Sequence, residues 1–216
     1  MKILVACEES QEVCKAFRAK GHEAYSCDLQ EPSGGHPEWH ILGDALDAVK
    51  GGRIVTMDGE THSVGTWDML IAHPPCTYLS NAGACRLYPH KGKLDVARYQ
   101  KGLEAKAFFM RFYDAEIQRI AVENPVSSKV FEMPPHTQEI QPWMFGHPYT
   151  KKTRLWLKRL SPLYPTDIVK PIAPYVPSGT GRKNRSAYGA AKRGEDAKNR
   201  SKTFTGIAKA MAEQWG

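Results

Sequence analysis

The sequence predicts an α/β fold in which a mostly parallel sheet is covered by helices on both faces. Short apolar segments recur along the chain, and polar residues or prolines follow each of them. A helical pattern separates the first two segments, which produces a strand–helix–strand opening. At 216 residues the chain has the length of one such domain. The predicted fold class is therefore a Rossmann-like sheet, which binds ligands at the carboxyl ends of its strands.

The amino end provides the first strand, helix and second strand. The strands are predicted over 2–7 and 24–28, with a helix over 10–20 between them and a hairpin over 50–65 further along. Asp28 ends the second strand, where Rossmann-like sheets place an acidic residue that binds ribose hydroxyls. An ordinary surface aspartate is the alternative.

A cysteine follows the next buried strand. The apolar run 67–73 reads as a strand, and Pro74 and Pro75 end it because proline fixes its own φ and donates no ladder hydrogen bond. Cys76 is thus presented on a stiff turn at a strand's carboxyl end, where ligands bind in such sheets. A small core cysteine is the alternative.

A glutamate ends a further strand. A helix is predicted over 94–112, and the short, partly β-branched run 117–122 after it ends in Glu123-Asn124-Pro125. Two successive strand ends therefore carry Cys76 and Glu123.

Three short motifs occur in a recognisable order. Pro75-Cys76 followed by Glu123-Asn124-Pro125 resembles the DNA cytosine-5 methyltransferase family, whose nucleophile motif is Pro-Cys and whose base-holding motif is Glu-Asn-Val. Proline replaces the third residue of the second motif here. Downstream, Lys152-Thr153-Arg154 precedes an apolar strand and is similar to the family's Arg-x-Arg core.

The resemblance implies a role for each of these residues. Cys76 would add as a thiolate to carbon 6 of cytosine, so that carbon 5 can attack a methyl donor. Glu123 would hold the N3 and amino edge of the base, protonated when the N3 bond forms, and would stabilise the charge that develops there during the addition. Alternation along a strand puts Lys152 and Arg154 on one face, where Arg154 would approach the base or its phosphate. A solvated basic edge is the alternative for this pair.

The resemblance also implies that the amino end binds S-adenosylmethionine. Gly43-Asp44-Ala45 is similar to the family's Gly-Asp-(Ile/Val) segment, whose aspartate faces the adenine. The first loop differs, since Cys7-Glu8-Glu9-Ser10 has no glycine where the family has Phe-x-Gly-x-Gly. Glu8 or Glu9 would meet the methionine ammonium, and Ser10 would cap the helix, whereas a pyrophosphate would be repelled. The expected cofactor-binding residues are Cys7, Glu8, Glu9, Ser10, Asp28, Leu29, Asp44, Ala45 and Pro74.

Positive charge is concentrated near the carboxyl end. The net charge is +7, but residues 150–216 hold fifteen Lys or Arg against four Asp or Glu. A glycine-rich basic segment over 178–194 predicts contact with DNA phosphates, and a solvated tail is the alternative. The expected DNA-binding residues are Arg182, Lys183, Arg185, Lys192 and Arg193.

The resemblance implies three parts of the chain. Residues 1–160 would form the catalytic core, and 161–202 would form a proline-rich and then basic strap, a reduced form of the family's target-recognition region. Residues 203–216 contain a helix with Ile207, Met211 and Trp215 on one stripe, which packs back onto the core. The chain resembles most closely the small methyltransferase-like proteins of bacteriophage genomes, which implies either low sequence specificity or recognition of the target sequence by a partner.

Composition argues against a membrane protein, a disulfide-stabilised protein and a metal-binding protein. No apolar run approaches the ~18 residues of a membrane span, and the amino end lacks a signal peptide, so we expect a protein of the host cell cytoplasm without a membrane partner. Five cysteines without paired spacing indicate reduced thiols, and no metal site is expected.

The expected function is methylation of cytosine C5 in DNA with S-adenosylmethionine. Because cytosine lies inside the duplex, the base would be flipped out or taken from single-stranded DNA. One alternative is an enzyme with the same adduct chemistry on a free pyrimidine nucleotide, or one that transfers another group. A DNA-binding protein that has lost catalysis is the other.

Overall fold

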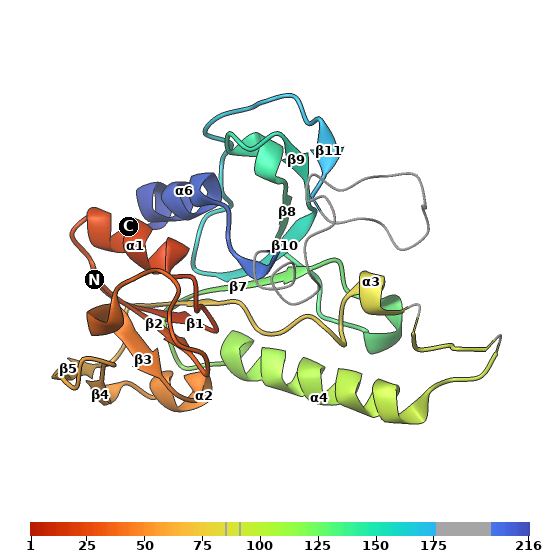
Figure 1. Cartoon of the computed structure of the whole chain (residues 1–216), viewed down its shortest axis with the longest axis horizontal. Helices are drawn as coiled ribbons and strands as arrows, with labels where there is room; N and C mark the ends of the chain where they lie inside the picture. Colours follow the sequence, from red (N-terminus) through yellow and green to blue (C-terminus); the bar gives the residue numbers. More distant parts are fainter. Residues whose placement is uncertain (85, 91, 176–199) are drawn as a thin grey trace.

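The protein is built around one seven-stranded sheet (Figure 1). The computed structural model describes residues 1–84, 86–90, 92–175 and 200–216. The strands lie in the order β3-β2-β1-β6-β7-β10-β8. Their bounds are β1 Lys2–Ala6, β2 Glu23–Asp28, β3 His40–Leu42, β6 Met69–Ala72, β7 Arg119–Pro125, β8 Gln138–Ile140 and β10 Thr153–Lys158.

The sheet is mostly parallel. Strands β3, β2, β1, β6 and β7 pair in parallel, whereas β10 is antiparallel to both of its neighbours, β7 and β8. From β1 the chain runs outward to β3 and then returns to β6 on the other side of β1. The β1–β6 boundary is therefore a topological switch point, the place where open α/β sheets bind ligands.

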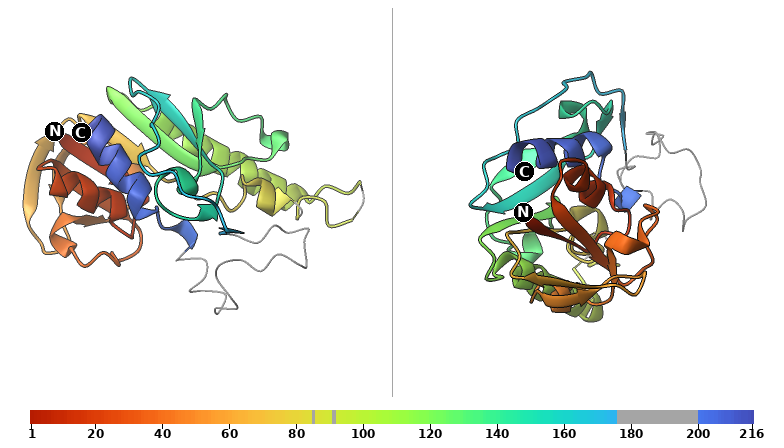
Figure 2. Two further views of the ribbon diagram at one scale, coloured as in Figure 1. Left: turned by 90° about the horizontal axis from the view of Figure 1, so that it is seen from above. Right: turned by 90° about the vertical axis from the view of Figure 1, so that its left-hand side faces the viewer.

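Side-chain alternation along each strand produces two apolar faces. On one face, Ile3, Val5 and Ile71 are fully buried together with residues of α1 (Glu12–Ala19) and α6 (Thr205–Trp215). Figures 1 and 2 show these two helices side by side. We call this side of the sheet the α1/α6 face.

The opposite face is covered by other helices. Leu4, Leu70 and Val122 are buried there with α2 (Ala45–Ala48) and α4 (Val96–Tyr113), and we call this side the α4 face. Helices thus cover both faces of the sheet. The predicted class, a Rossmann-like α/β fold of the kind expected for S-adenosylmethionine-dependent methyltransferases, is confirmed.

Smaller elements complete the described part of the chain. The predicted hairpin is present as the antiparallel pair β4 and β5. A second small sheet joins β9 and β11 in parallel, which fixes the proline-rich segment before residue 176 against the 149–150 segment. The bounds are β4 Gly52–Val55, β5 Thr61–Gly65, β9 Tyr149–Thr150, β11 Ala173–Pro174 and α3 Asn81–Ala84, with 3-10 turns at Pro37–Trp39, Lys129–Phe131 and Pro142–Met144.

The helix at the carboxyl end buries its apolar stripe. Ile207, Met211 and Trp215 are each at most 4% exposed, and they pack with α1 and the sheet. Within the described ranges, no helix combines the length and apolar character needed to cross a bilayer.

Candidate active site

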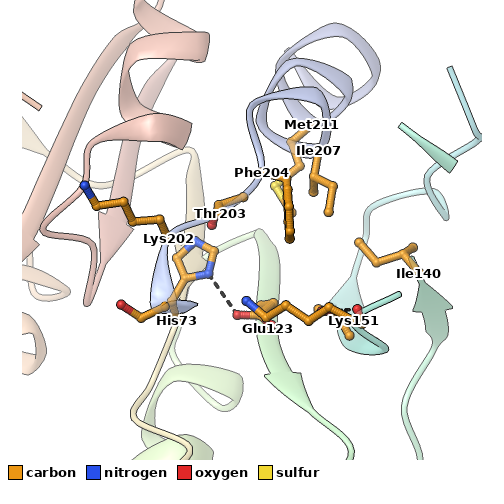
Figure 3. Close-up of a pocket in the computed structure, with 11 residues that line it drawn as sticks. His73, Glu123, Ile140, Lys151, Lys202, Thr203, Phe204, Ile207 and Met211 are labelled. Carbon is orange, nitrogen blue, oxygen red and sulfur yellow. Dashed lines mark hydrogen bonds and ion pairs between the residues drawn. The ribbon is translucent and has the colours of Figure 1, made fainter. Parts of the chain in front are cut away.

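A histidine and a glutamate face each other at the carboxyl edge of the sheet. His73 follows β6 and Glu123 lies near the end of β7, and both alternate onto the α1/α6 face with Ile71 and Ala121. Nδ1 of His73 is 3.2 Å from Oε2 of Glu123, with the two side chains 10% and 23% exposed (Figure 3). The sequence analysis did not select His73, although it directly precedes the Pro-Pro-Cys turn.

Glu123 is held in its ionised form. Burial raises its pKa, but the hydrogen bond from His73, the charge of a protonated His73 and the charge of Lys151 outweigh burial, so that the pKa lies below its ordinary value. A carboxylate in this state accepts hydrogen bonds and donates none.

Cys76 lies within electrostatic reach of the same carboxylate. The Pro74 carbonyl that precedes it accepts a hydrogen bond of 2.9 Å from Nδ2 of Asn124, which ties the Pro-Pro turn to β7. The thiol is partly buried, and burial raises its pKa, with Glu123 raising it further and Lys151 lowering it. Cys76 and Glu123, separated by 47 positions in the chain, are therefore neighbours, and the thiol is protonated at neutral pH in the free protein.

The cation beside Glu123 is Lys151. It lines the same pocket as His73 and Glu123, and its Nζ donates a 2.7 Å hydrogen bond to the carbonyl of Arg200. Its Nζ also lies 5.8 Å and 5.7 Å from the ring centroids of Tyr175 and Phe204. Sequence reasoning missed Lys151 because the family pattern was aligned one residue further along.

Lys152 and Arg154 have another partner. Both pair with Glu139 of β8, at 2.9 Å from Nζ of Lys152 and 2.9 Å from Nε of Arg154. Arg154 lies opposite Asn124 in the β10–β7 register and alternates with Leu155, which is buried on the α1/α6 face. Arg154 therefore lies on the α4 side of the sheet, and the structure brings neither Lys152 nor Arg154 to Glu123.

His73, Glu123 and Lys151 line an open pocket, whereas Cys76, Lys152 and Arg154 are not among its lining residues. Its empty volume is about 320 Å³ and is continuous with solvent (Figure 3). The segment just before α6 forms one wall, and the first turns of α6 form another. The lining residues are His73, Glu123, Ile140, Lys151, Thr153, Ser201, Lys202, Thr203, Phe204, Ile207 and Met211.

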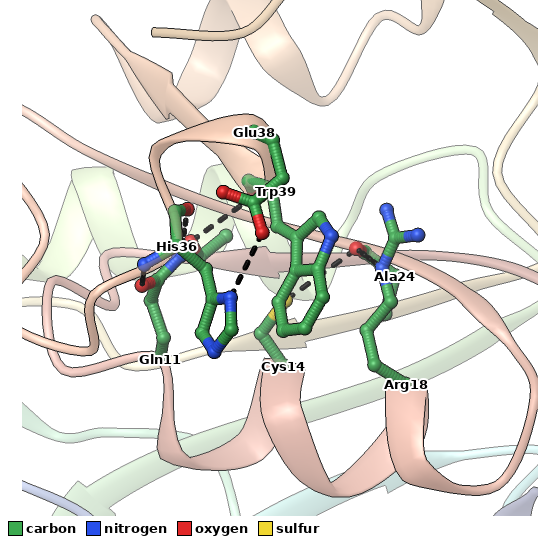
Figure 4. A network of polar contacts seen from close by, with 8 residues as sticks. Gln11, Cys14, Arg18, Ala24, His36, Glu38 and Trp39 are labelled. Atoms are coloured by element: carbon green, nitrogen blue, oxygen red, sulfur yellow. Dashed lines mark hydrogen bonds and ion pairs between the residues drawn. The ribbon is translucent and has the colours of Figure 1, made fainter. Parts of the chain in front are cut away.

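The first loop adopts left-handed backbone conformations without glycine. Cys7 and Gln11 have φ of 58° and 60°, a region that non-glycine residues seldom occupy. The buried side chain of Gln11 holds the loop. Its Nε2 donates to the His36 carbonyl at 2.8 Å and to Oγ of Ser26 at 3.2 Å, and its Oε1 accepts from the His36 N–H at 3.1 Å (Figure 4).

Glu8, rather than Ser10, caps the first helix. The Glu8 carboxylate accepts from the N–H of Val13 at 2.6 Å and of Cys14 at 3.2 Å, so the predicted Ser10 cap is wrong. Burial raises the pKa of Glu8 to about 7, with the charge of His73 and the two backbone hydrogen bonds acting in the opposite direction. Glu8 thus lies close enough to His73 for their charges to interact.

The other predicted cofactor residues gather at the ends of β1, β2 and β3. Burial raises the pKa of Cys7, and Asp28, Cys27 and Asp44 raise it further, which places these four groups near one another. Oδ1 of Asp28 accepts from the Gln30 N–H at 3.0 Å, and Oδ1 of Asp44 accepts from the Leu46 N–H at 2.9 Å. The remaining residues of this set differ in exposure: Glu9, Ser10, Ala45 and Pro74 are buried, whereas Leu29 is 78% exposed.

The predicted DNA-binding residues Arg182, Lys183, Arg185, Lys192 and Arg193 lie outside the described residues. Among the residues that are described, no group of three or more His, Cys, Asp or Glu side chains is arranged to hold a metal ion.

Comparisons with known proteins give weak likenesses. No protein-family model matches the chain, and no curated protein matches it. One similar solved structure is described as a DNA modification methyltransferase encoded within an E. coli prophage, with 12% identity, a TM-score of 0.43, and coverage of 79% of this chain and 52% of that chain. Another is the Entamoeba histolytica methyltransferase EhMeth, with 12% identity, a TM-score of 0.38, and coverage of 81% and 57%. The chain spans little more than half the length of either protein.

Proposed function

We propose that this protein methylates carbon 5 of cytosine in DNA with S-adenosylmethionine. The observation that carries the proposal is that the turn before Cys76 is tied to the end of β7, next to Glu123, by the 2.9 Å hydrogen bond from Nδ2 of Asn124 to the Pro74 carbonyl. A thiol and a carboxyl group that takes up a proton when it bonds to N3 are the two groups that this chemistry needs on one base. Both come from strand ends, so the sheet holds them rigidly.

The thiol would act as the nucleophile. Cys76 loses its proton and its sulfur adds to carbon 6, which makes carbon 5 electron-rich and able to take a methyl group. Lys151 favours the thiolate because its charge lowers the pKa of Cys76. The raised pKa of the free thiol keeps Cys76 unreactive until a base is bound.

Glu123 would hold the edge of the base. Its Oε2 contacts His73, and within the described residues no hydrogen bond reaches Oε1. Oε1 is thus available to accept from the exocyclic amino group of cytosine, a group that uracil and thymine lack. We infer that Lys151 is the cation nearest the base, and that Lys152 and Arg154 meet the DNA backbone.

The acidic β1–β3 edge fits a cationic cofactor. Glu8, Asp28 and Asp44 bring negative charge to the strand ends, which opposes a pyrophosphate and suits the ammonium and sulfonium of S-adenosylmethionine. Asp28 and Asp44 would hold ribose and adenine, with exposed Leu29 beside them and Cys7 to Ser10 at the methionine end. When bound, the cofactor supplies an electrophilic methyl group.

DNA would be held by positive charge outside this edge. We propose that the basic residues between 178 and 194 contact phosphates without reading bases, which implies low sequence specificity. The protein would act in the cytoplasm of a host cell if it is encoded by a bacteriophage.

Trapping the covalent adduct tests this function. DNA containing 5-fluorocytosine, incubated with protein and S-adenosylmethionine, is expected to form a complex that survives denaturation, because fluorine blocks the final elimination. Cys76→Ser should form none, whereas Cys14→Ala, a change at a cysteine in the α1 core, should form it normally.

Two further measurements separate the alternatives. Adduct formation with free 5-fluorodeoxycytidine monophosphate but not with DNA would favour an enzyme of nucleotides. DNA binding without calorimetric binding of S-adenosylmethionine would indicate a protein that has lost catalysis.

A further inference from the structure

His73 lies between the two halves of the carboxyl edge. It follows β6, whose neighbours in the sheet are β1 and β7, so it has the first loop on one side and Glu123 on the other. Its side chain is 10% exposed and lines the pocket (Figure 3). Its Nε2 is buried and has no hydrogen-bond partner among the described residues.

The hydrogen bond to Glu123 determines which ring nitrogen carries the proton. Because Glu123 is ionised, it can only accept, so Nδ1 of His73 must be the donor. In the neutral ring the free lone pair is then on Nε2. This is the arrangement in which a carboxylate orients a histidine and stabilises it once it has gained a proton.

The proposed reaction leaves one proton without an acceptor. After carbon 5 has gained its methyl group it still carries its hydrogen, which must be removed to restore the ring. Among the described lining residues, Lys151 and Lys202 are cations without a lone pair, and the hydroxyls are weak bases. Glu123 is occupied by the edge of the base. His73 is the remaining proton acceptor among these lining residues, and imidazole is the side chain that most often serves as a general base.

The position of His73 suits this proton. Carbon 5 is bonded to carbon 4, which carries the amino group that Glu123 would accept. His73 is hydrogen-bonded to the other oxygen of the same carboxylate, so it is held next to the group that would bind this edge of the base.

We propose that Nε2 of His73 is the general base that removes the proton from carbon 5. The inference rests on the proposed function. In this step the C5–H bond breaks and its proton moves to Nε2, while its electron pair forms the C5–C6 double bond. The C6–S bond breaks, and its electrons return to Sγ of Cys76. The Glu123 carboxylate stabilises the imidazolium that forms.

His73→Asn tests this assignment, because the Asn amide can keep a donor near the Nδ1 position while the Nε2 base is removed. With S-adenosylmethionine and DNA of ordinary cytosine, this variant should turn over ~10²–10⁴-fold more slowly. It should also accumulate a methylated, denaturation-stable complex that the wild type does not accumulate. Added imidazole should restore part of the turnover, and Cys76→Ser in the same variant should abolish the complex.

Two controls make the result specific. The adduct with 5-fluorocytosine DNA needs no proton removal at carbon 5, so wild type and His73→Asn should form it at similar rates. His62→Asn, on the hairpin strand β5, should behave as the wild type throughout.

The outcomes separate the two proposals. If His73→Asn turns over at the wild-type rate and accumulates no trapped complex, the role of His73 is overturned and the proposed function is not. Equal slowing of fluorocytosine adduct formation and of turnover also overturns it, because His73 would then act before or during the addition. Failure of the wild type to form any adduct overturns the proposed function, and the role of His73 with it.

Discussion

The carboxyl edge of the sheet has two halves, which differ in what their carboxylates bind. At the ends of β1, β2 and β3, carboxylates accept hydrogen bonds from backbone N–H groups a few residues further along the chain. At the ends of β6 and β7, a carboxylate is hydrogen-bonded to a side chain that follows the neighbouring strand. Glu8, Asp28 and Asp44 show the first arrangement, and Glu123 with His73 shows the second. In the first half, Asp28 and Asp44 are held by local turns and Glu8 is buried. The second half brings together a carboxylate, a histidine, a lysine and a thiol from different segments of the chain.

This difference indicates that one half of the edge is suited to binding and the other to the chemical step. Local backbone contacts build a binding surface whose parts are independent of one another, so a single change should weaken binding and little else. In the cross-strand cluster, Glu123 raises the pKa of Cys76 and is itself hydrogen-bonded to His73, so a single change should alter the chemical step.

The largest expected effect is that of Glu123→Gln. Gln keeps one acceptor oxygen but has no negative charge and cannot accept from the amino group and from His73 at the same time, so kcat should fall by ~10²–10³-fold. Cofactor affinity, measured by calorimetry, should stay unchanged. Glu60→Gln, in the exposed turn between β4 and β5, is the matched control. A parallel loss of cofactor affinity would show that the two halves are not independent.

Asp28→Ala and Asp44→Ala should act on binding. Each should weaken S-adenosylmethionine binding by ~1–3 kcal/mol, the cost of leaving a polar partner unpaired, with DNA affinity nearly unchanged. Asp47→Ala, an exposed change on α2 that removes the pair with Lys50, should have no effect. Normal cofactor affinity in both Asp28→Ala and Asp44→Ala would reject the pocket at the β1–β3 edge.

The next comparison is between two cations near the start of β10 that lie on different faces of the sheet. The variants are Lys151→Ala, just before β10, and Arg154→Ala, within it. Lys151 contributes charge at Glu123 and Cys76, and its loss should lower kcat by ~10-fold. Arg154 pairs with Glu139 on the other face, so Arg154→Ala should raise the KM for DNA more than it lowers kcat. A larger loss of kcat in Arg154→Ala than in Lys151→Ala would indicate that Arg154, not Lys151, is the cation that acts in catalysis.

Glu8→Gln has the smallest expected effect, which is on stability. Burial raises the folded-state pKa of Glu8 to about 7 from an ordinary value of 4.5. The folded protein therefore binds more protons than the unfolded chain between these values, and its stability falls as pH rises through that window. Urea unfolding of the wild type should lose ~1–3 kcal/mol across it, and Glu8→Gln should lose less. Identical pH dependence in the two proteins would exclude Glu8 as the source.

Local patterns in the sequence were sufficient to predict the long strands and two of the site residues, Cys76 and Glu123. The buried strands β1, β6 and β7 and the helices α1, α4 and α6 come where apolar periodicity predicts them. Prolines follow β6 and end β7, so the sequence alone is sufficient to predict that Cys76 and Glu123 lie at strand ends. The short elements β3, β8 and α2 were missed, because three or four residues carry no measurable period.

What only the tertiary structure decided is which side chains meet. Strand order puts His73 next to Glu123, and the β10–β7 register puts Arg154 opposite Asn124, on the other face from Glu123. Lys151, which precedes β10, lines the pocket with Glu123. Since side chains alternate with period two, a shift of one residue moves a whole set to the other face. The Glu8 cap arises in the same way, because a left-handed turn at Cys7 and Gln11 determines which side chain reaches the helix start. Sequence patterns determine which residues lie at strand ends, whereas pairing across strands depends on register and topology, which act through space.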